Sequence, residues 1–211
     1  TVIGLYAKDP ENTRIISASY EGRYAGINLF NRICQSTLNP NGKNLTSFCD
    51  KYNSHQSHGL RVGDPVILTE NNWENNPNSN LFGRIIAAYD EPLPITVKDD
   101  RKELSLGLVK LDDESVHPIL LSSMLDNSKR IQLAYCFDIH NTHGSKFNRV
   151  IIPVPDIHSS IINRSWLYTA LSCASASVIF VGKTAHINKI ITTTSKLFSR
   201  ISALKSMLDQ L

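Results

Sequence analysis

Residues 133–155 have the sequence LAYCFDIHNTHGSKFNRVIIPVP. Apolar residues predict one strand over Leu133–Phe137 and a second over Val150–Val154, with a polar segment between them. A helix is predicted over Asn163–Ala174 and a further strand over Val178–Val181. Strands that alternate with helices are typical of a largely parallel sheet covered by helices, so this stretch predicts an α/β fold.

The flanking segments extend the same pattern in both directions. Residues Arg14–Leu38 contain a short apolar run and then, after two glycines, apolar residues near the helical period. Residues Ile187–Leu211 predict an amphipathic helix, because their apolar residues recur at helical spacing. Residues Asn39–Gly59 are rich in Asn, Ser, Gly and Lys, and this composition predicts a long loop.

A different pattern occupies the middle of the chain, where short apolar runs are separated by turn-rich stretches. The candidate strands are Pro65–Thr69, Arg84–Tyr89, Pro94–Lys98 and Ser105–Leu111. Short strands with frequent breaks favour a small barrel or a curled sheet. We therefore expect an α/β domain formed by residues 1–59 and 131–211, interrupted by a small β-barrel-like insertion over residues 60–130.

The composition restricts the function only loosely. The chain has 211 residues, of which 41% are hydrophobic and 19% charged, and this suffices for a buried core. Its formal charge of +3 permits contact with phosphate groups without arguing for it. Because no apolar run approaches the roughly 18–20 residues that span a bilayer, we expect no membrane partner and a cytoplasmic location. The first residue is Thr1, and we expect the chain to be a piece of a longer protein.

Four stretches of the chain, taken in order, share residues and spacing with one protein family. They are Gly26–Pro40 (GINLFNRICQSTLNP), Leu60–Glu70 (LRVGDPVILTE) followed by Leu81–Phe82, Leu133–Phe147 (LAYCFDIHNTHGSKF) and Trp166–Gly182 (WLYTALSCASASVIFVG). Together they resemble the C-terminal RecA-like motor domain of RecD/TraA-type superfamily 1 DNA helicases, which are exodeoxyribonuclease V alpha subunit-like. The resemblance implies a RecA-like, P-loop-NTPase-type parallel sheet flanked by helices.

In that family two RecA-like lobes clamp ATP between them, and the N-terminal lobe carries the phosphate-binding loop and the magnesium site. Neither motif occurs in this chain. The triplet Gly182-Lys183-Thr184 lacks the glycine-rich cradle, because Ser177 stands five residues before Gly182, and it predicts a strand end that enters a helix. The resemblance therefore implies ATP and Mg²⁺ for a full-length parent with an intact first lobe, and no cofactor in this chain alone.

The resemblance also assigns positions near the nucleotide, namely Arg23, Gly144, Lys146, Ser172 and Cys173. Cys173 stands where the family has its arginine finger, and a short, mostly neutral thiol cannot replace a guanidinium. Loss of such a finger lowers the rate roughly 10³–10⁵-fold in the systems where it has been measured. Lys146 replaces a glutamate and reverses the charge. We therefore predict no catalytic residue in this chain and no activity of the chain alone.

The segment that the resemblance places against DNA comprises His140, Asn141, Thr142, His143 and Ser145. The family's Lys-Ser-Gln is here Asn141-Thr142-His143, so hydrogen bonding remains while the cation is lost. The partners implied are single-stranded DNA, the N-terminal lobe of the same parent chain and other exonuclease V-type subunits. The two histidines at 140 and 143 lack an evident set of further ligands, so no metal site is predicted.

Two functions stay open from the sequence. The first is the C-terminal domain of an ATP-dependent DNA helicase or exodeoxyribonuclease V alpha-like protein of DNA repair, which contributes to single-stranded DNA contact and to the ATP site between the lobes. The second is a catalytically retired helicase-like lobe that acts as a nucleic-acid-binding or protein-interaction scaffold. The substitutions at 146 and 173 motivate the second.

Overall fold

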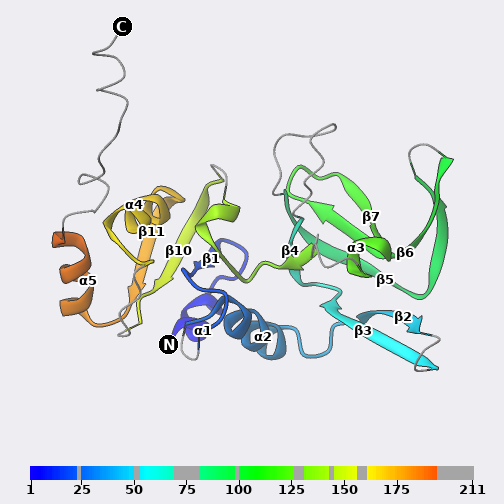
Figure 1. Ribbon diagram of the computed structural model, residues 1–211, viewed down its shortest axis with the longest axis horizontal. Coiled ribbons are helices and arrows are strands. Elements are labelled where there is room, and N and C mark those ends of the chain that lie inside the picture. Colours follow the sequence, from blue (N-terminus) through cyan, green and yellow to red (C-terminus); the bar gives the residue numbers. More distant parts are fainter. Residues whose placement is uncertain are drawn as a thin grey trace, which may run out of the picture.

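The computed structural model describes residues 1–22, 25–49, 53–68, 81–97, 100–125, 131–142, 145–155 and 161–193. Its elements form two groups, which lie side by side in Figure 1. The first group consists of α1 (Val2–Tyr6), β1 (Thr13–Ile16), α2 (Ile27–Leu38), β9 (Cys136–Phe137), the 3₁₀ helix η3 (Ile139–Asn141), β10 (Phe147–Pro153), α4 (Arg164–Ser172), β11 (Ala174–Val181) and α5 (Thr184–Thr192). The second group consists of β2 (Asn44–Cys49), β3 (Ser54–Arg61), β4 (Pro65–Leu68), β5 (Leu81–Thr96), β6 (Lys102–Leu111), β7 (Val116–Leu120), α3 (Ser122–Leu125) and β8 (Ile131–Leu133).

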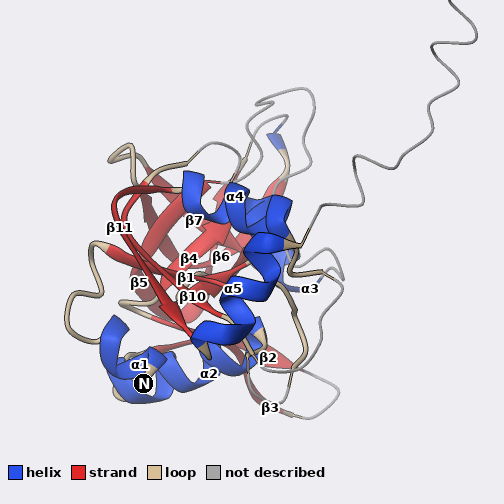
Figure 2. Ribbon diagram, turned by 90° about the vertical axis from the view of Figure 1, so that its left-hand side faces the viewer, coloured by secondary structure: helices blue, strands red, loops and turns tan. Residues whose placement is uncertain are grey.

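The first group is a parallel sheet with helices on both faces. Its strand order is β11-β10-β1-β9, and each neighbouring pair is parallel. Helices α1 and α2 lie apart from α4 and α5 around this sheet (Figure 2). Successive side chains of a strand point to opposite faces, so Ile15 packs with α1 and α2 while Ile16 packs with α4 and α5. This arrangement confirms the α/β, RecA-like parallel sheet that the sequence predicts.

The prediction of a single strand over Leu133–Phe137 is wrong in one respect, because the structure has two strands here, separated by two residues. Leu133 ends β8, which pairs antiparallel with β4, whereas Cys136 begins β9, which pairs parallel with β1. The chain therefore passes from one sheet to the other at Ala134 and Tyr135. Periodicity could not show this, because residues 133–137 form one uninterrupted apolar run.

The helix predicted over Asn163–Ala174 is confirmed with slightly shorter bounds. Asn163 is its N-cap, and the side-chain oxygen accepts a hydrogen bond from the Trp166 amide at 3.0 Å. The helix predicted over Ile187–Leu211 begins earlier, at Thr184, and ends at Thr192. Residues 194–211 lie outside the described part of the chain. The part that is described contains no helix long and apolar enough to cross a bilayer.

The second group is built on a five-stranded antiparallel sheet of order β7-β6-β5-β4-β8. Strand β5 runs from Leu81 to Thr96 without the interruption that the sequence predicted, because a register shift against β6 accommodates residues 89–92. Among the described strands β7 and β8 are edges, so the predicted closure into a small barrel is not confirmed. The limits of the insertion stay a prediction.

The predicted loop over Asn39–Gly59 is wrong, because most of it forms the antiparallel hairpin β2–β3. Leu45 and Leu60 enter the core of the second group, while most other side chains of the hairpin are exposed. Backbone hydrogen bonds therefore hold the strands together, and these do not depend on side-chain polarity. Gly59 has φ of 75°, a value that a residue with a Cβ atom adopts at a cost.

Three phenylalanines join the two groups. The ring centroid of Phe82, on β5, lies 5.0 Å from that of Phe137 and 5.3 Å from that of Phe147. Phe137 ends β9 and Phe147 begins β10, and their own centroids are 5.4 Å apart. Aromatic contacts of this kind add to the free energy gained by burying the rings, so the inserted sheet is packed directly against the parallel sheet.

A buried carboxylate makes a second junction. Asp64, which is fully buried, accepts hydrogen bonds from the side chains of Gln35 at 2.5 Å, Asn39 at 2.7 Å and Tyr135 at 2.8 Å. The backbone amide of Arg61 donates a fourth, at 2.8 Å. A buried carboxylate is tolerated where hydrogen bonds replace its hydration. These contacts tie α2, the turn before β4 and the β8–β9 connection together.

Candidate nucleotide-facing and DNA-facing site

Residues 138–146 connect the carboxyl end of β9 to the amino end of β10. Asp138 begins the connection, and its Oδ1 accepts a hydrogen bond from the amide of His140 at 3.2 Å, which caps η3. Thr142 ends the turn: its hydroxyl donates to the Ile139 carbonyl at 2.7 Å, and its side chain is buried. Thr142 was predicted to face DNA, but its buried hydroxyl is already used in a hydrogen bond within the turn.

The exposed part of this connection meets a residue that follows β1. The side-chain amide of Asn141 donates to the hydroxyl of Tyr20 at 3.3 Å, and Tyr20 is 45% exposed. His140 is exposed beside them, and Ser145 is half-buried. Sequence reasoning missed Tyr20, although an aromatic residue directly after a predicted strand of a parallel sheet was an available signal. His143 and Gly144 lie outside the described residues.

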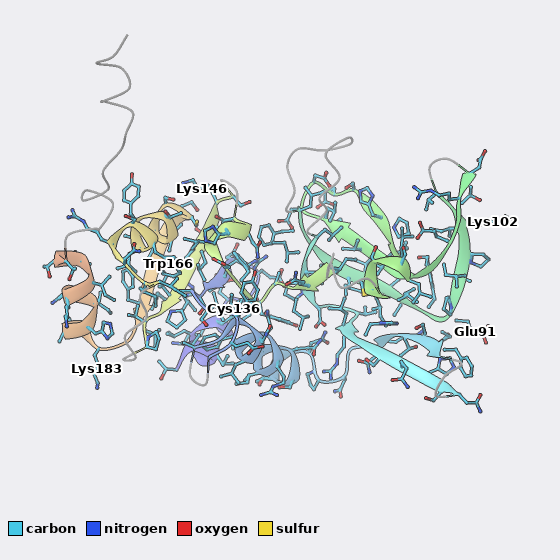
Figure 3. All side chains as sticks on the ribbon, viewed as in Figure 1. Glu91, Lys102, Cys136, Lys146, Trp166 and Lys183 are labelled. Carbon is cyan, nitrogen blue, oxygen red and sulfur yellow. The ribbon has the colours of Figure 1, made fainter. Side chains whose placement is uncertain are left out.

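Lys146 lies at the amino end of β10, against the C-terminus of α4. Its ammonium donates a hydrogen bond to the backbone carbonyl of Ser172, and Figure 3 labels the residue at the top of the group that contains α4. The carbonyls that end a helix carry partial negative charge, which a cation stabilises. Lys146 and Ser172 were both predicted to lie near the nucleotide, and the structure brings these two together.

Cys173 follows Ser172 and is turned into the core. Its side chain is 4% exposed and packs in the cluster that contains Trp166 and Ala170. The thiol lies 3.3 Å from the Thr169 carbonyl, as a donor to it. Its backbone carbonyl accepts a hydrogen bond from the Phe147 amide at 2.8 Å. The position at which the family resemblance expects a guanidinium is therefore part of the packing between α4 and the sheet.

The predicted site residues thus fall into two places. His140 and Asn141 lie with Tyr20 beyond the carboxyl ends of β9 and β1, whereas Lys146, Ser172 and Cys173 lie at the amino ends of β10 and β11. Arg23, the remaining predicted residue, lies outside the described part of the chain. Within that part, no group of three or more potential metal ligands is present.

A cleft of about 550 Å³ opens beside Lys146, between the parallel sheet and the inserted sheet. Its walls carry both signs of charge, and Arg84 of β5 spans it to form an ion pair with Glu11 at 2.8 Å. Lys110 pairs with Glu114 on the same wall. Arg84 and Lys110 are thus paired with carboxylates, while Arg14 and Lys146 donate to backbone carbonyls. Each cation of this cleft therefore already has a partner before an anionic ligand binds.

A family model described as the UvrD-like helicase C-terminal domain matches residues 133–181, which include His140, Asn141, Lys146, Ser172 and Cys173 but not Tyr20. The RecBCD enzyme subunit RecD of Buchnera aphidicola (subspecies Acyrthosiphon pisum, strain APS) is 21% identical over 188 residues, a match that covers 89% of this chain and 27% of the relative. The chain is therefore similar over residues 133–181 to the UvrD-like helicase C-terminal domain, and over most of its length to part of RecD.

One of the similar solved structures supports the fold of the chain. A structure of two coordinating Pif1 helicases at forked double-stranded DNA is 17% identical, with a TM-score of 0.50, and covers 97% of this chain and 48% of that one. Pif1 from Bacteroides in complex with ADP-AlF3 and single-stranded DNA is also 17% identical, with a TM-score of 0.49 and coverage of 90% and 44%. The chain therefore spans about half of these chains and about a quarter of the curated relative.

Proposed function

We propose that this chain is the C-terminal motor lobe of a longer ATP-dependent DNA helicase. In this proposal His140, Asn141 and Tyr20 contact single-stranded DNA, and Lys146 with the end of α4 faces ATP and Mg²⁺ held by an N-terminal lobe. The observation that carries it is the short connection of residues 138–146, in which the half-buried Asn141 contacts Tyr20 and Lys146 contacts Ser172. The division into residues 1–59 and 131–211 around an insertion at 60–130 is part of this proposal.

The lobe contributes little to the chemistry of hydrolysis in this proposal. Phosphoryl transfer needs positive charge against the γ-phosphate in the transition state. Cys173 supplies none, because its neutral side chain lies in the core. Lys146 already neutralises the partial charge at the end of α4. The chain alone is therefore expected not to hydrolyse ATP, and its main role is to hold DNA and to close over the nucleotide.

A retired lobe that only binds nucleic acid or another protein is the second candidate. The observation that favours it is the packing of Cys173 with Trp166 and Ala170, which makes the position a part of the core rather than a vacant place for a catalytic side chain. This candidate keeps the DNA contact or replaces it with a protein contact. It differs from the first in predicting no DNA-stimulated ATP hydrolysis by the longer protein.

Two measurements separate these candidates. The first is ATP hydrolysis by the longer protein with and without single-stranded DNA: robust stimulated turnover rejects the retired lobe, and absence of turnover rejects the motor. The second is fluorescence anisotropy of the 211-residue chain with labelled single-stranded DNA over a salt series. Phosphate contact requires affinity to fall as salt rises, so a flat salt dependence contradicts the proposed DNA contact.

Substitutions at Tyr20 and Asn141 test whether these residues contact the DNA. Tyr20→Ala and Asn141→Asp are expected to weaken DNA binding, because the first removes an exposed aromatic ring and the second adds a negative charge at the same place. Asn188→Asp, an exposed amide on α5, is the matched control for the added charge and should bind as the wild type does. Equal weakening by the control would show that net charge alone accounts for the change.

A further inference from the structure

A groove runs along α2 between the parallel sheet and the second group. It has a volume of about 470 Å³, and its far wall is formed by β3 and by β8 with its neighbours. We call it the α2 groove. Apolar side chains lie in it, among them Leu60, Ile131 and Leu133, while the polar groups include Asn28, Arg32 and His58. An apolar floor with polar groups beside it suits a ligand that has flat rings and a charged or polar chain.

The charge of the α2 groove has one sign. Arg32 lies on its edge as an exposed side chain, and it has no hydrogen-bond or ion-pair partner among the described residues. None of the described residues that line the groove is acidic. The cleft beside Lys146 differs in this respect, because three carboxylates lie in its walls and two of them pair with its cations. An anionic ligand is therefore favoured in the α2 groove over that cleft.

Asn28 and Arg32 lie one helical turn apart on the same face of α2. The side-chain amide of Asn28 has no partner in the described part of the chain, so it is free to donate to an oxygen atom of a ligand. On the opposite wall burial lowers the pKa of His58, whose ring hydrogen-bonds the Ser47 hydroxyl at 2.9 Å. The His58 ring is therefore neutral near pH 7 and adds a hydrogen-bonding group rather than a charge.

The groove begins where the proposed DNA contact ends. The backbone amide of Asn28 donates to the carbonyl of Tyr20 at 3.2 Å, and the hydroxyl of the same tyrosine accepts from Asn141 at 3.3 Å. From Ile27 to Gln35 the groove follows two turns of helix, about 12 Å at 1.5 Å per residue. A chain molecule that lies against Tyr20 can therefore continue directly into it.

We infer that the α2 groove binds the sugar–phosphate backbone of a single nucleic-acid strand, with Arg32 and Asn28 as the residues that contact it. The inference rests on the proposed function, because the strand it describes is the one that contacts Tyr20 and Asn141. It adds a second stretch of contact, formed by α2 and the β2–β3 hairpin, to the contact at the ends of β1 and β9.

The test compares two variants of the 211-residue chain with a matched control. Asn28→Asp places a carboxylate in the groove, and Arg32→Gln removes its free cation. Arg164→Gln, an exposed arginine at the start of α4, is the control, because α4 covers the opposite face of the parallel sheet. Binding is measured by anisotropy with labelled oligothymidine of about 6 and about 15 nucleotides, within the range that single-strand-binding surfaces occupy.

For the longer strand we expect each groove variant to weaken binding roughly two- to fivefold, because Arg32→Gln loses one exposed charge contact and Asn28→Asp adds one repulsive charge. Arg32→Gln should also reduce the slope of log K against log salt by about 0.7, the value for one phosphate contact with a single strand. The shorter strand should bind both variants as it binds the wild type. Asn28→Asp should leave stability unchanged or higher, because a carboxylate in the first turn of a helix is favourable.

Two results would overturn the inference, and they can be told apart. If both groove variants bind the longer strand as the wild type does while Tyr20→Ala weakens it, the α2 groove is not a contact, and the proposed function stands. If the wild-type chain binds neither strand, the groove and the proposed DNA contact fail together. Equal weakening by Arg164→Gln would count against the groove as well, because only net charge would then matter.

Discussion

The hydroxyl of Tyr135 donates a hydrogen bond of 2.8 Å to Oδ1 of Asp64, 71 residues earlier in the chain. Burial, and after it the nearby Asp64 carboxylate, raises the pKa of Tyr135 well above its usual range, so the phenol stays protonated and remains a donor. Gln35, Asn39, Asp64 and Tyr135 all come from the stretches that resemble RecD-type helicases. Their place in the structure is the joint between the two groups of elements.

Asp64→Asn should destabilise the chain strongly for so small a change. The new amide would turn a donor toward groups that already donate, and leaving buried donors unpaired costs about 1–3 kcal/mol. Urea unfolding followed by circular dichroism measures the loss. Asp112→Asn, an exposed aspartate, is the control and should change the free energy of unfolding by less than about 0.5 kcal/mol. If the two variants were equally stable, Asp64 would not be a structural joint.

Gly107→Ala should disrupt the pairing of β5 with β6. An added Cβ atom would lie 2.1 Å from the backbone oxygen of Ala87, and two paired strands cannot separate locally without losing hydrogen bonds. We expect a loss of at least about 2 kcal/mol in the free energy of unfolding. In contrast, Gly4→Ala, on the helix α1, meets no atom within 4 Å and should be neutral or slightly stabilising. Wild-type stability of Gly107→Ala would contradict the strand register.

His58 should make stability depend on pH. Burial lowers the pKa of the folded His58 below its usual value near 6.5, so the unfolded chain binds this proton more readily. The stabilising contribution is therefore fully present above about pH 6.5 and is lost as pH falls through the unfolded pKa toward the folded one.

The measurement for His58 is the free energy of unfolding of the wild type minus that of His58→Gln, from about pH 8 to about pH 5. This difference should decrease as the pH is lowered, by no more than about 1.4 kcal/mol per pH unit, which is the limit for one proton. His55→Gln, an exposed residue on the same strand, should leave the wild-type pH dependence intact. A difference that rises as the solution becomes more acidic would show the opposite sign and reject the argument.

We expect the Cys173→Arg variant to unfold more readily than the wild type, and we do not expect its new side chain to act as an arginine finger. The position is 4% exposed in the cluster with Trp166, so a guanidinium would have to enter the core or push α4 away from the sheet. Overpacking of this kind costs typically about 1–3 kcal/mol, and a buried charge adds to it.

Ser172→Arg is the matched substitution for Cys173→Arg, because the neighbouring side chain is exposed. It should change the melting temperature little. The two variants are compared by thermal unfolding and, in the longer protein, by DNA-stimulated ATP hydrolysis. A stable Cys173→Arg variant with raised hydrolysis would mean that the side chain can reach the nucleotide, against the packing described above.

Much of the fold follows from the sequence. The alternation of apolar strands with amphipathic helices specified the parallel sheet, because a helix needs an apolar face to cover a strand that is buried on both sides. Ile15 and Ile16 are adjacent in the apolar run that predicted this strand, and the structure places each against different helices. The family resemblance also singled out Lys146 and Cys173, and the roles it implies for them stay predictions.

Only the tertiary structure decided what these residues contact. The β2–β3 hairpin was hidden because backbone hydrogen bonds hold it, and these leave little trace in side-chain periodicity. The division of residues 133–137 between two sheets, and the meeting of Tyr135 with Asp64, depend on segments far apart in the chain. Periodicity reports which face of an element is buried, whereas the partner on that face is set by how the elements pack together.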